Sequence, residues 1–159
     1  MKKKSINLFA ISVAMIVLAS ISISTSAFGQ EKFSVSGEIV FYEEQGEFRV
    51  GLRTFEEFGA IDQQAGPGRG LVIEPTSQQL KAKRVPFNFV DVPAGTYCIV
   101  CLHDLNKSGK MDKIPETGFP LEPYGFSGEL SFGMAMWEQV SFKVDKNLSG
   151  IEIMLERVD

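Results

Sequence analysis

Residues 95–127 read GTYCIVCLHDLNKSGKMDKIPETGFPLEPYGFS, and this stretch is the most informative part of the chain. Its first ten residues are apolar on both faces of an extended chain, which is typical of a strand in the middle of a sheet. The run ends in Asp104, and oxygen-bearing side chains then occupy alternate positions of a short loop. A segment rich in glycine and aromatic residues follows. The stretch therefore predicts a central strand, a candidate ion-binding loop and a candidate contact surface.

Short segments on either side of this stretch also have strand character. The turn at Glu44–Gly46 predicts a hairpin between the first two, and Pro86 indicates an edge strand or a bulge. Only residues 54–61 have helical character. The six further strands are predicted at 33–41, 47–53, 70–74, 84–90, 139–144 and 151–155.

Seven strands with almost no helix predict an all-β fold. Each half-apolar sheet can bury its inner face only against another sheet, so we expect an antiparallel two-sheet β-sandwich. The turn Asp91–Gly95, which leads into a strand with an early tyrosine, resembles those of transthyretin-like and carboxypeptidase-regulatory-like sandwiches. An Ig-like or transthyretin-like sandwich is the expected type.

The N-terminal residues predict export. Lys2, Lys3 and Lys4 precede a long apolar run, and small residues lead up to Gly29, so residues 1–29 read as a cleaved signal peptide. The alternative is an uncleaved membrane anchor. Residues 30–159 form the single predicted domain, with 13 basic and 20 acidic residues and a net charge of −7. We expect a secreted or periplasmic protein without stable membrane insertion after cleavage, and acidity disfavours nucleic acid as a partner.

The two cysteines are predicted to be free thiols. Cys98 and Cys101 form a C-x-x-C pattern inside an apolar strand, where residues three apart point to opposite faces about 10 Å apart. A disulfide needs Cα atoms within about 7 Å. Redox C-x-x-C pairs instead begin a helix, which this segment does not predict.

The loop after Asp104 has the spacing of a calcium site. Oxygen-bearing side chains occupy positions 1, 3, 5 and 9, and Gly109 at position 6 permits the turn that brings the Lys110 carbonyl inward. Glu116 stands one residue after the position where a calcium loop has its bidentate glutamate. The predicted ligands are Asp104, Asn106, Ser108, Lys110, Asp112 and Glu116.

Two observations leave open that this loop is a hydrogen-bonded hairpin and not a calcium site. Three lysines balance the three acids of residues 104–116, so calcium binding would be weak, with a Kd of about 10⁻⁴ to 10⁻³ M. The same residues also suit a hydrogen-bonded hairpin in which Asp and Asn accept backbone N–H groups.

Three motifs of this region resemble the bacterial secreted family DUF2141. They are a P-x-G-x-Y turn at Pro93–Tyr97, an HD-x-N-x-x-G-x-x-D loop at His103–Asp112, and a GYGFS-like segment at Pro123–Ser127. The resemblance implies a secreted β-sandwich and no particular activity. Ser108 stands where the family more often has Asn, and the spacing from Asp112 to Gly118 is one residue longer than usual.

No catalytic constellation is evident. His103 is the only histidine, and on a strand it points away from the adjacent Asp104, so the two cannot act as a dyad. A structural role at the end of the strand is the favoured interpretation, and we expect the protein not to be an enzyme.

Residues 122–137 form the candidate partner-binding segment. Tyr124, Phe126, Phe132 and Trp137 could contact an unknown protein, peptide or glycan, although a lid that buries its own aromatic side chains is favoured. The expected function is a binding or accessory module with a weak structural calcium site. The alternatives are a transthyretin-like carrier of a small ligand and, least favoured, a hydrolase.

Overall fold

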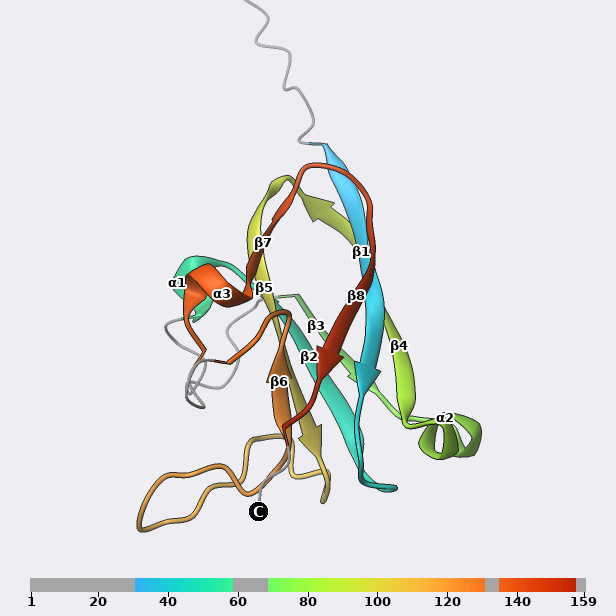
Figure 1. The fold of residues 1–159 in the computed structure, drawn as a ribbon, viewed down its shortest axis with the longest axis vertical. Helices are drawn as coiled ribbons and strands as arrows, with labels where there is room; N and C mark the ends of the chain where they lie inside the picture. The colour runs from blue at the N-terminus through green and yellow to red at the C-terminus, as the bar shows by residue number, and fades with distance from the viewer. Residues whose placement is uncertain (1–30, 59–68, 131–134, 157–159) are drawn as a thin grey trace, which may run out of the picture.

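The computed structural model describes residues 31–58, 69–130 and 135–156, and it is built from two packed β-sheets (Figure 1). The first sheet, sheet A, has the order β4 (Arg84–Pro93), β1 (Lys32–Val40), β8 (Leu148–Met154). The second, sheet B, has the order β3 (Arg69–Ile73), β2 (Glu47–Arg53), β5 (Gly95–Asp104), β6 (Tyr124–Phe126). Strand β7 (Ser141–Val144) pairs with the first half of β5. The predicted two-sheet all-β fold is confirmed, with eight strands in these residues instead of seven.

The core lies between the two sheets. Alternation along β4 points Val85, Phe87 and Phe89 inward, where they meet the inward residues of sheet B, such as Leu52 and Ile99. Burying a side chain of this size contributes roughly 1.5–3 kcal/mol. Strand β5 is the central strand expected from its two apolar faces, because it has β2 on one side and both β6 and β7 on the other.

Two expectations about connectivity were wrong. Strands β1 and β2 do not form a hairpin, since residues 41–46 cross from sheet A to sheet B and bury Phe41 in the core on the way. The sheets are also not wholly antiparallel. Strand β8 runs parallel to β1, because the chain crosses back from sheet B after β7 before it enters sheet A.

Three short helices complete the described residues. Helix α1 (Phe55–Phe58) lies in the predicted helical segment, and α3 (Trp137–Val140) precedes β7. Helix α3 was not predicted, and its residues 139–140 were expected to begin a strand. Helix α2 (Ser77–Ala82) was also missed, although its sequence carries a recognisable signal. The Thr76 hydroxyl accepts the Gln79 backbone N–H, and Gln79 Oε1 accepts the Thr76 backbone N–H, which together form a capping box.

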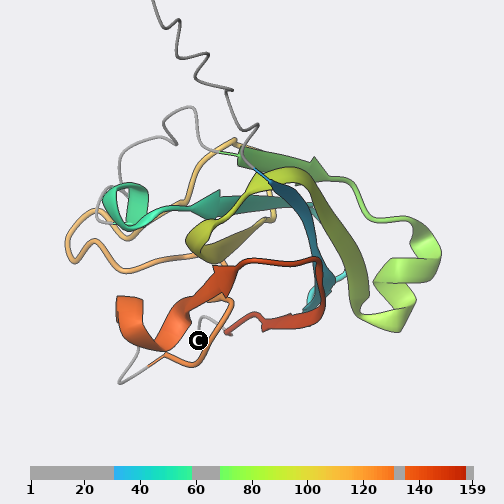
Figure 2. The same ribbon diagram turned by 90° about the horizontal axis from the view of Figure 1, so that it is seen from above.

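A second, smaller hydrophobic cluster covers the outer face of sheet B. Cys98 and Phe126 are buried there, and the aromatic rings of Phe58 and Trp137 pack beside them. Figure 2 shows α1 and α3 at the same end of the molecule, with α2 at the opposite end. No helix among the described residues is long and apolar enough to span a membrane. The predicted signal peptide lies outside the described residues.

The two cysteines are free thiols on opposite faces of β5, as predicted. Cys98 lies in the smaller cluster and Cys101 in the main core. Burial raises the pKa of the Cys98 thiol to about 12, and it raises that of Cys101 further. Neither side chain therefore carries a reactive thiolate at neutral pH.

A thiol titration checks this arrangement. We expect neither cysteine to react readily with Ellman's reagent at pH 8 in the native protein, and both to react after unfolding in guanidinium without reductant. Fewer than two thiols per unfolded chain would contradict the free-thiol assignment.

Candidate functional site

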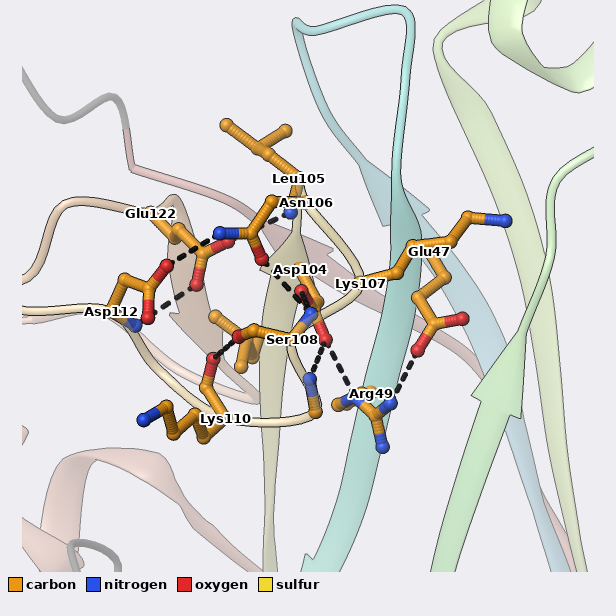
Figure 3. A network of polar contacts seen from close by, with 12 residues as sticks. Glu47, Arg49, Asp104, Leu105, Asn106, Lys107, Ser108, Lys110, Asp112 and Glu122 are labelled. Atoms are coloured by element: carbon orange, nitrogen blue, oxygen red, sulfur yellow. Dashed lines mark hydrogen bonds and ion pairs between the residues drawn. The ribbon is translucent and has the colours of Figure 1, made fainter.

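The candidate site begins where β2 and β5 meet at the end of sheet B. The register of these two strands places Glu47 directly opposite Asp104, and both carboxylates are buried. Arg49 lies two residues along β2 on the same face. Its Nε donates to Asp104 Oδ2 over 2.8 Å, and its Nη2 donates to Glu47 Oε1. One guanidinium thus neutralises two neighbouring acids (Figure 3).

Asp104 also organises the loop that follows it. Its Oδ1 accepts the backbone N–H of Ser108 over 2.8 Å, and its Oδ2 accepts that of Gly109 over 2.7 Å. Two left-handed residues allow the chain to turn around the carboxylate, Lys107 at φ 57° and Gly109 at φ 87°. This is the hydrogen-bonded arrangement that the sequence left open as an alternative.

The ionisation of Asp104 follows from these contacts. Burial alone would raise the pKa of this carboxyl, but the hydrogen bonds from Arg49, Gly109 and Ser108 outweigh burial and lower it. The pKa of Arg49 is raised, chiefly by its hydrogen bond to Asp104. Both groups are therefore charged over the whole physiological pH range.

A second buried carboxylate, that of Glu122, links the two ends of the loop. Glu122 is 3% exposed, and its two oxygens accept the backbone N–H groups of Leu105 at 2.9 Å and Asp112 at 3.1 Å. The chain leaving β5 and the chain returning towards β6 are thereby held together. The sequence prediction missed this residue, since Glu122 lies 17 residues from Leu105 and follows no metal-ligand spacing.

The remaining predicted ligands bond to one another. Asn106 Nδ2 donates to Asp112 Oδ2 over 2.6 Å, while Asn106 Oδ1 accepts the backbone N–H of Ser108. The Ser108 hydroxyl donates to the Lys110 carbonyl over 3.0 Å. Figure 3 shows these side chains grouped on one side of the loop. Five of the six predicted residues are thus brought together, whereas Glu116 lies exposed in the turn beyond Ile114.

The arrangement does not fit a calcium ion as it stands. Calcium takes six to eight oxygen ligands, but the Asp104 carboxylate, the first of the predicted ligands, is here bonded through Oδ2 to the Arg49 guanidinium. Across the described parts of the chain, no group of three or more His, Cys, Asp or Glu side chains could hold a metal ion. An ion at Asp104 would also lie beside the positive charge of Arg49.

The tip of the loop is a small hairpin with exposed apolar side chains. Leu121 N–H donates to Asp112 O over 2.8 Å and Ile114 N–H to Phe119 O over 2.8 Å, with a tight turn at Gly118. Phe119 is 67% exposed and Leu121 is 50% exposed. The whole segment extends away from both sheets (Figure 1).

The aromatic residues of 122–137 lie elsewhere. Tyr124 and Phe126 belong to β6, and Phe126 is buried against Phe58. Trp137 packs against Phe55 and Phe58 of α1, with ring centroids 5.4 and 5.5 Å apart. These residues cover sheet B, which agrees with the favoured interpretation that the segment buries its own aromatic side chains. Phe132 falls outside the described residues.

His103 is a core residue. It is fully buried, stacks on Phe48 with ring centroids 4.3 Å apart, and meets the edge of Phe41. Its Nε2 lies 2.7 Å from the Gln45 carbonyl oxygen, and Nδ1 lies 3.7 Å from Glu43. Burial lowers the pKa of His103, so the ring is neutral at pH 7. A substrate in solvent cannot reach it in this structure.

An open cleft of about 830 Å³ lies between the edges of the two sheets at β6 and β8. Phe126 and Leu155 contribute apolar surface, and Glu129 and Glu156 stand among its lining residues. The cleft is not the cavity between the sheets that a transthyretin-like carrier would use, because large side chains fill that space.

Comparisons with known proteins give one match. A family model described as "Uncharacterized protein conserved in bacteria (DUF2141)" matches residues 43–151, which include all six predicted ligands as well as Arg49 and Glu122. No curated protein and no solved structure matches the chain.

Proposed function

The chain belongs to the DUF2141 family of uncharacterized bacterial proteins, and we propose from its geometry that it is an extracytoplasmic, non-enzymatic binding module. The binding surface is the hairpin at 112–121. One observation carries the proposal: Phe119 and Leu121, 67% and 50% exposed, are displayed on a projecting segment whose base is fixed by buried hydrogen bonds.

Fixing exposed apolar groups in this way favours binding. Exposed apolar side chains cost solubility when they have no partner, and contiguous ones mark interaction sites. Phe119 and Leu121 are two residues apart on one arm of the hairpin, so both side chains leave the same face. Because the hairpin is already ordered, a partner that covers these side chains loses little affinity to ordering the loop.

The location outside the cytoplasm rests on the predicted signal peptide at residues 1–29. The absence of catalysis is supported by the burial of His103, the residue on which a hydrolase would depend. The partner class is a protein, peptide or glycan. Calcium has no part in the proposal, since Arg49 already neutralises Asp104.

Site-specific photo-crosslinking tests the proposal. A benzoylphenylalanine at position 119, in the exported protein in its own cells, should give a discrete higher-mass adduct. The matched control is the same group at Val90, which is 61% exposed on β4. Leu121→Ser in the position-119 protein should reduce the adduct without changing the melting temperature. Equal adducts at both positions, or none at position 119, would contradict the proposed surface.

A further inference from the structure

The loop after Asp104 has calcium-like spacing but carries its own cation. We propose that Arg49 is a built-in counter-ion that replaces calcium at this loop, so that the loop is ordered without metal. The inference concerns the base of the loop and does not depend on the partner proposed for its tip.

The strand register explains why a cation is needed here. Glu47 and Asp104 are direct cross-strand neighbours of β2 and β5, and their side chains are 8% and 0% exposed. Like charges opposite each other destabilise a strand pair, and burial makes an uncompensated charge costlier still. A positive group within reach of both carboxylates removes this conflict.

Arg49 meets that requirement from within sheet B. It follows Glu47 by two residues, so both side chains leave β2 on the same face. Its planar fork donates from Nε to Asp104 and from Nη2 to Glu47, a geometry that a lysine cannot reproduce. The side chain is 34% exposed, which leaves the charge partly hydrated while Asp104 is fully covered.

The guanidinium also lies against the loop itself. A Cβ at Gly109 would be 3.5 Å from Arg49 Nη2, so the arginine passes directly beneath the turn that calcium loops place at position 6. The same Asp104 oxygen accepts both Arg49 Nε and the Gly109 N–H. Arg49 therefore places its positive charge at Asp104, which is position 1 of the calcium-like loop.

Thermal melting in EDTA and in 10 mM calcium chloride tests the proposal. Wild-type protein should melt at the same temperature, within about 1 °C, in both solutions. Arg49→Met keeps much of the apolar stem but removes the charge, and it should melt several degrees lower in EDTA. Calcium should then raise its melting temperature by about 4–6 °C, the shift expected when calcium is near ten times its Kd.

Three controls show whether the calcium response of Arg49→Met comes from the lost positive charge and from Asp104. Arg49→Lys retains a positive charge and should remain insensitive to calcium despite a lower melting temperature. In Arg49→Met/Asp104→Asn the calcium response should disappear. Magnesium at 10 mM should stabilise Arg49→Met less than calcium does, because magnesium demands a stricter octahedral site.

The outcomes that overturn the proposal are distinct. A saturable calcium shift of several degrees in wild type would show that Arg49 does not replace the ion. If calcium does not raise the melting temperature of Arg49→Met, the loop cannot bind a calcium ion even without the arginine. If Arg49→Met is unfolded in EDTA, 10 mM calcium must restore its near-UV circular dichroism, and failure to do so counts against the proposal.

Discussion

Gly37→Ala should lower the free energy of unfolding by about 3 kcal/mol, near the upper end of what overpacking costs. Gly37 lies in the middle of β1, paired with Phe87 on β4 and with Ile151 on β8. A Cβ at this position would overlap the Ile151 backbone carbonyl, and the Phe87 ring would be 2.9 Å away. The carbonyl cannot rotate aside as a side chain can, so β1 and β8 would have to separate. Urea denaturation measures the loss.

The matched control for this substitution is Gly70→Ala. Gly70 also lies in a strand, but a Cβ there would meet only the Val50 carbonyl oxygen at 3.8 Å, an ordinary contact. We expect a change within about 0.5 kcal/mol. Equal effects of the two substitutions would show that the close approach of β1 and β8 is not the cause.

Glu122→Ala should cost about 2–4 kcal/mol, because it leaves two part-buried backbone N–H groups without an acceptor, and each such donor costs about 1–2 kcal/mol, the lower part of the usual range. Glu122 accepts from Leu105 and Asp112, which lie at the two ends of the 104–112 loop. Glu122→Gln keeps one acceptor and presents an amide donor to the other N–H, so it should lose at least one of the two bonds. Chemical denaturation gives the loss, and amide hydrogen exchange at Leu105 and Asp112 locates it.

Glu116→Ala is the control for Glu122. Glu116 is an exposed acid of the same segment, and its removal should leave both stability and exchange unchanged. The role of Glu122 would be contradicted if Leu105 and Asp112 kept their protection in Glu122→Ala.

The strands were predictable from sequence because their signals are local. Alternation at 33–41 and 84–90 and the doubly apolar run at 95–104 match β1, β4 and β5 closely. Pro86 does lie on an edge strand, as its missing N–H requires. Tyr124–Phe126 was missed as a strand because three residues give no clear alternation.

The connections and the site residues depend on distant parts of the chain. The turn at Glu44–Gly46 has hairpin composition, yet composition does not determine whether the next strand joins the same sheet or the facing one. Arg49 was passed over because its role comes from the register that brings residue 47 to residue 104. The spacing of the Asp104 loop predicted a calcium site, with a hydrogen-bonded turn around the carboxylate as the alternative, and spacing alone cannot show which cation the carboxylate faces.

The pairing of β1 with β8 also bears on when the chain can fold. Among the described strands, β1 in the middle of sheet A is synthesised first, and its neighbour β8, beginning at Leu148, is synthesised last. Until β8 has emerged from the ribosome, one edge of β1 lacks its native neighbour. Pairing so distant in sequence also slows folding, since a long loop must close first. Sheet A can therefore be completed only after residues 148–154 have emerged from the ribosome.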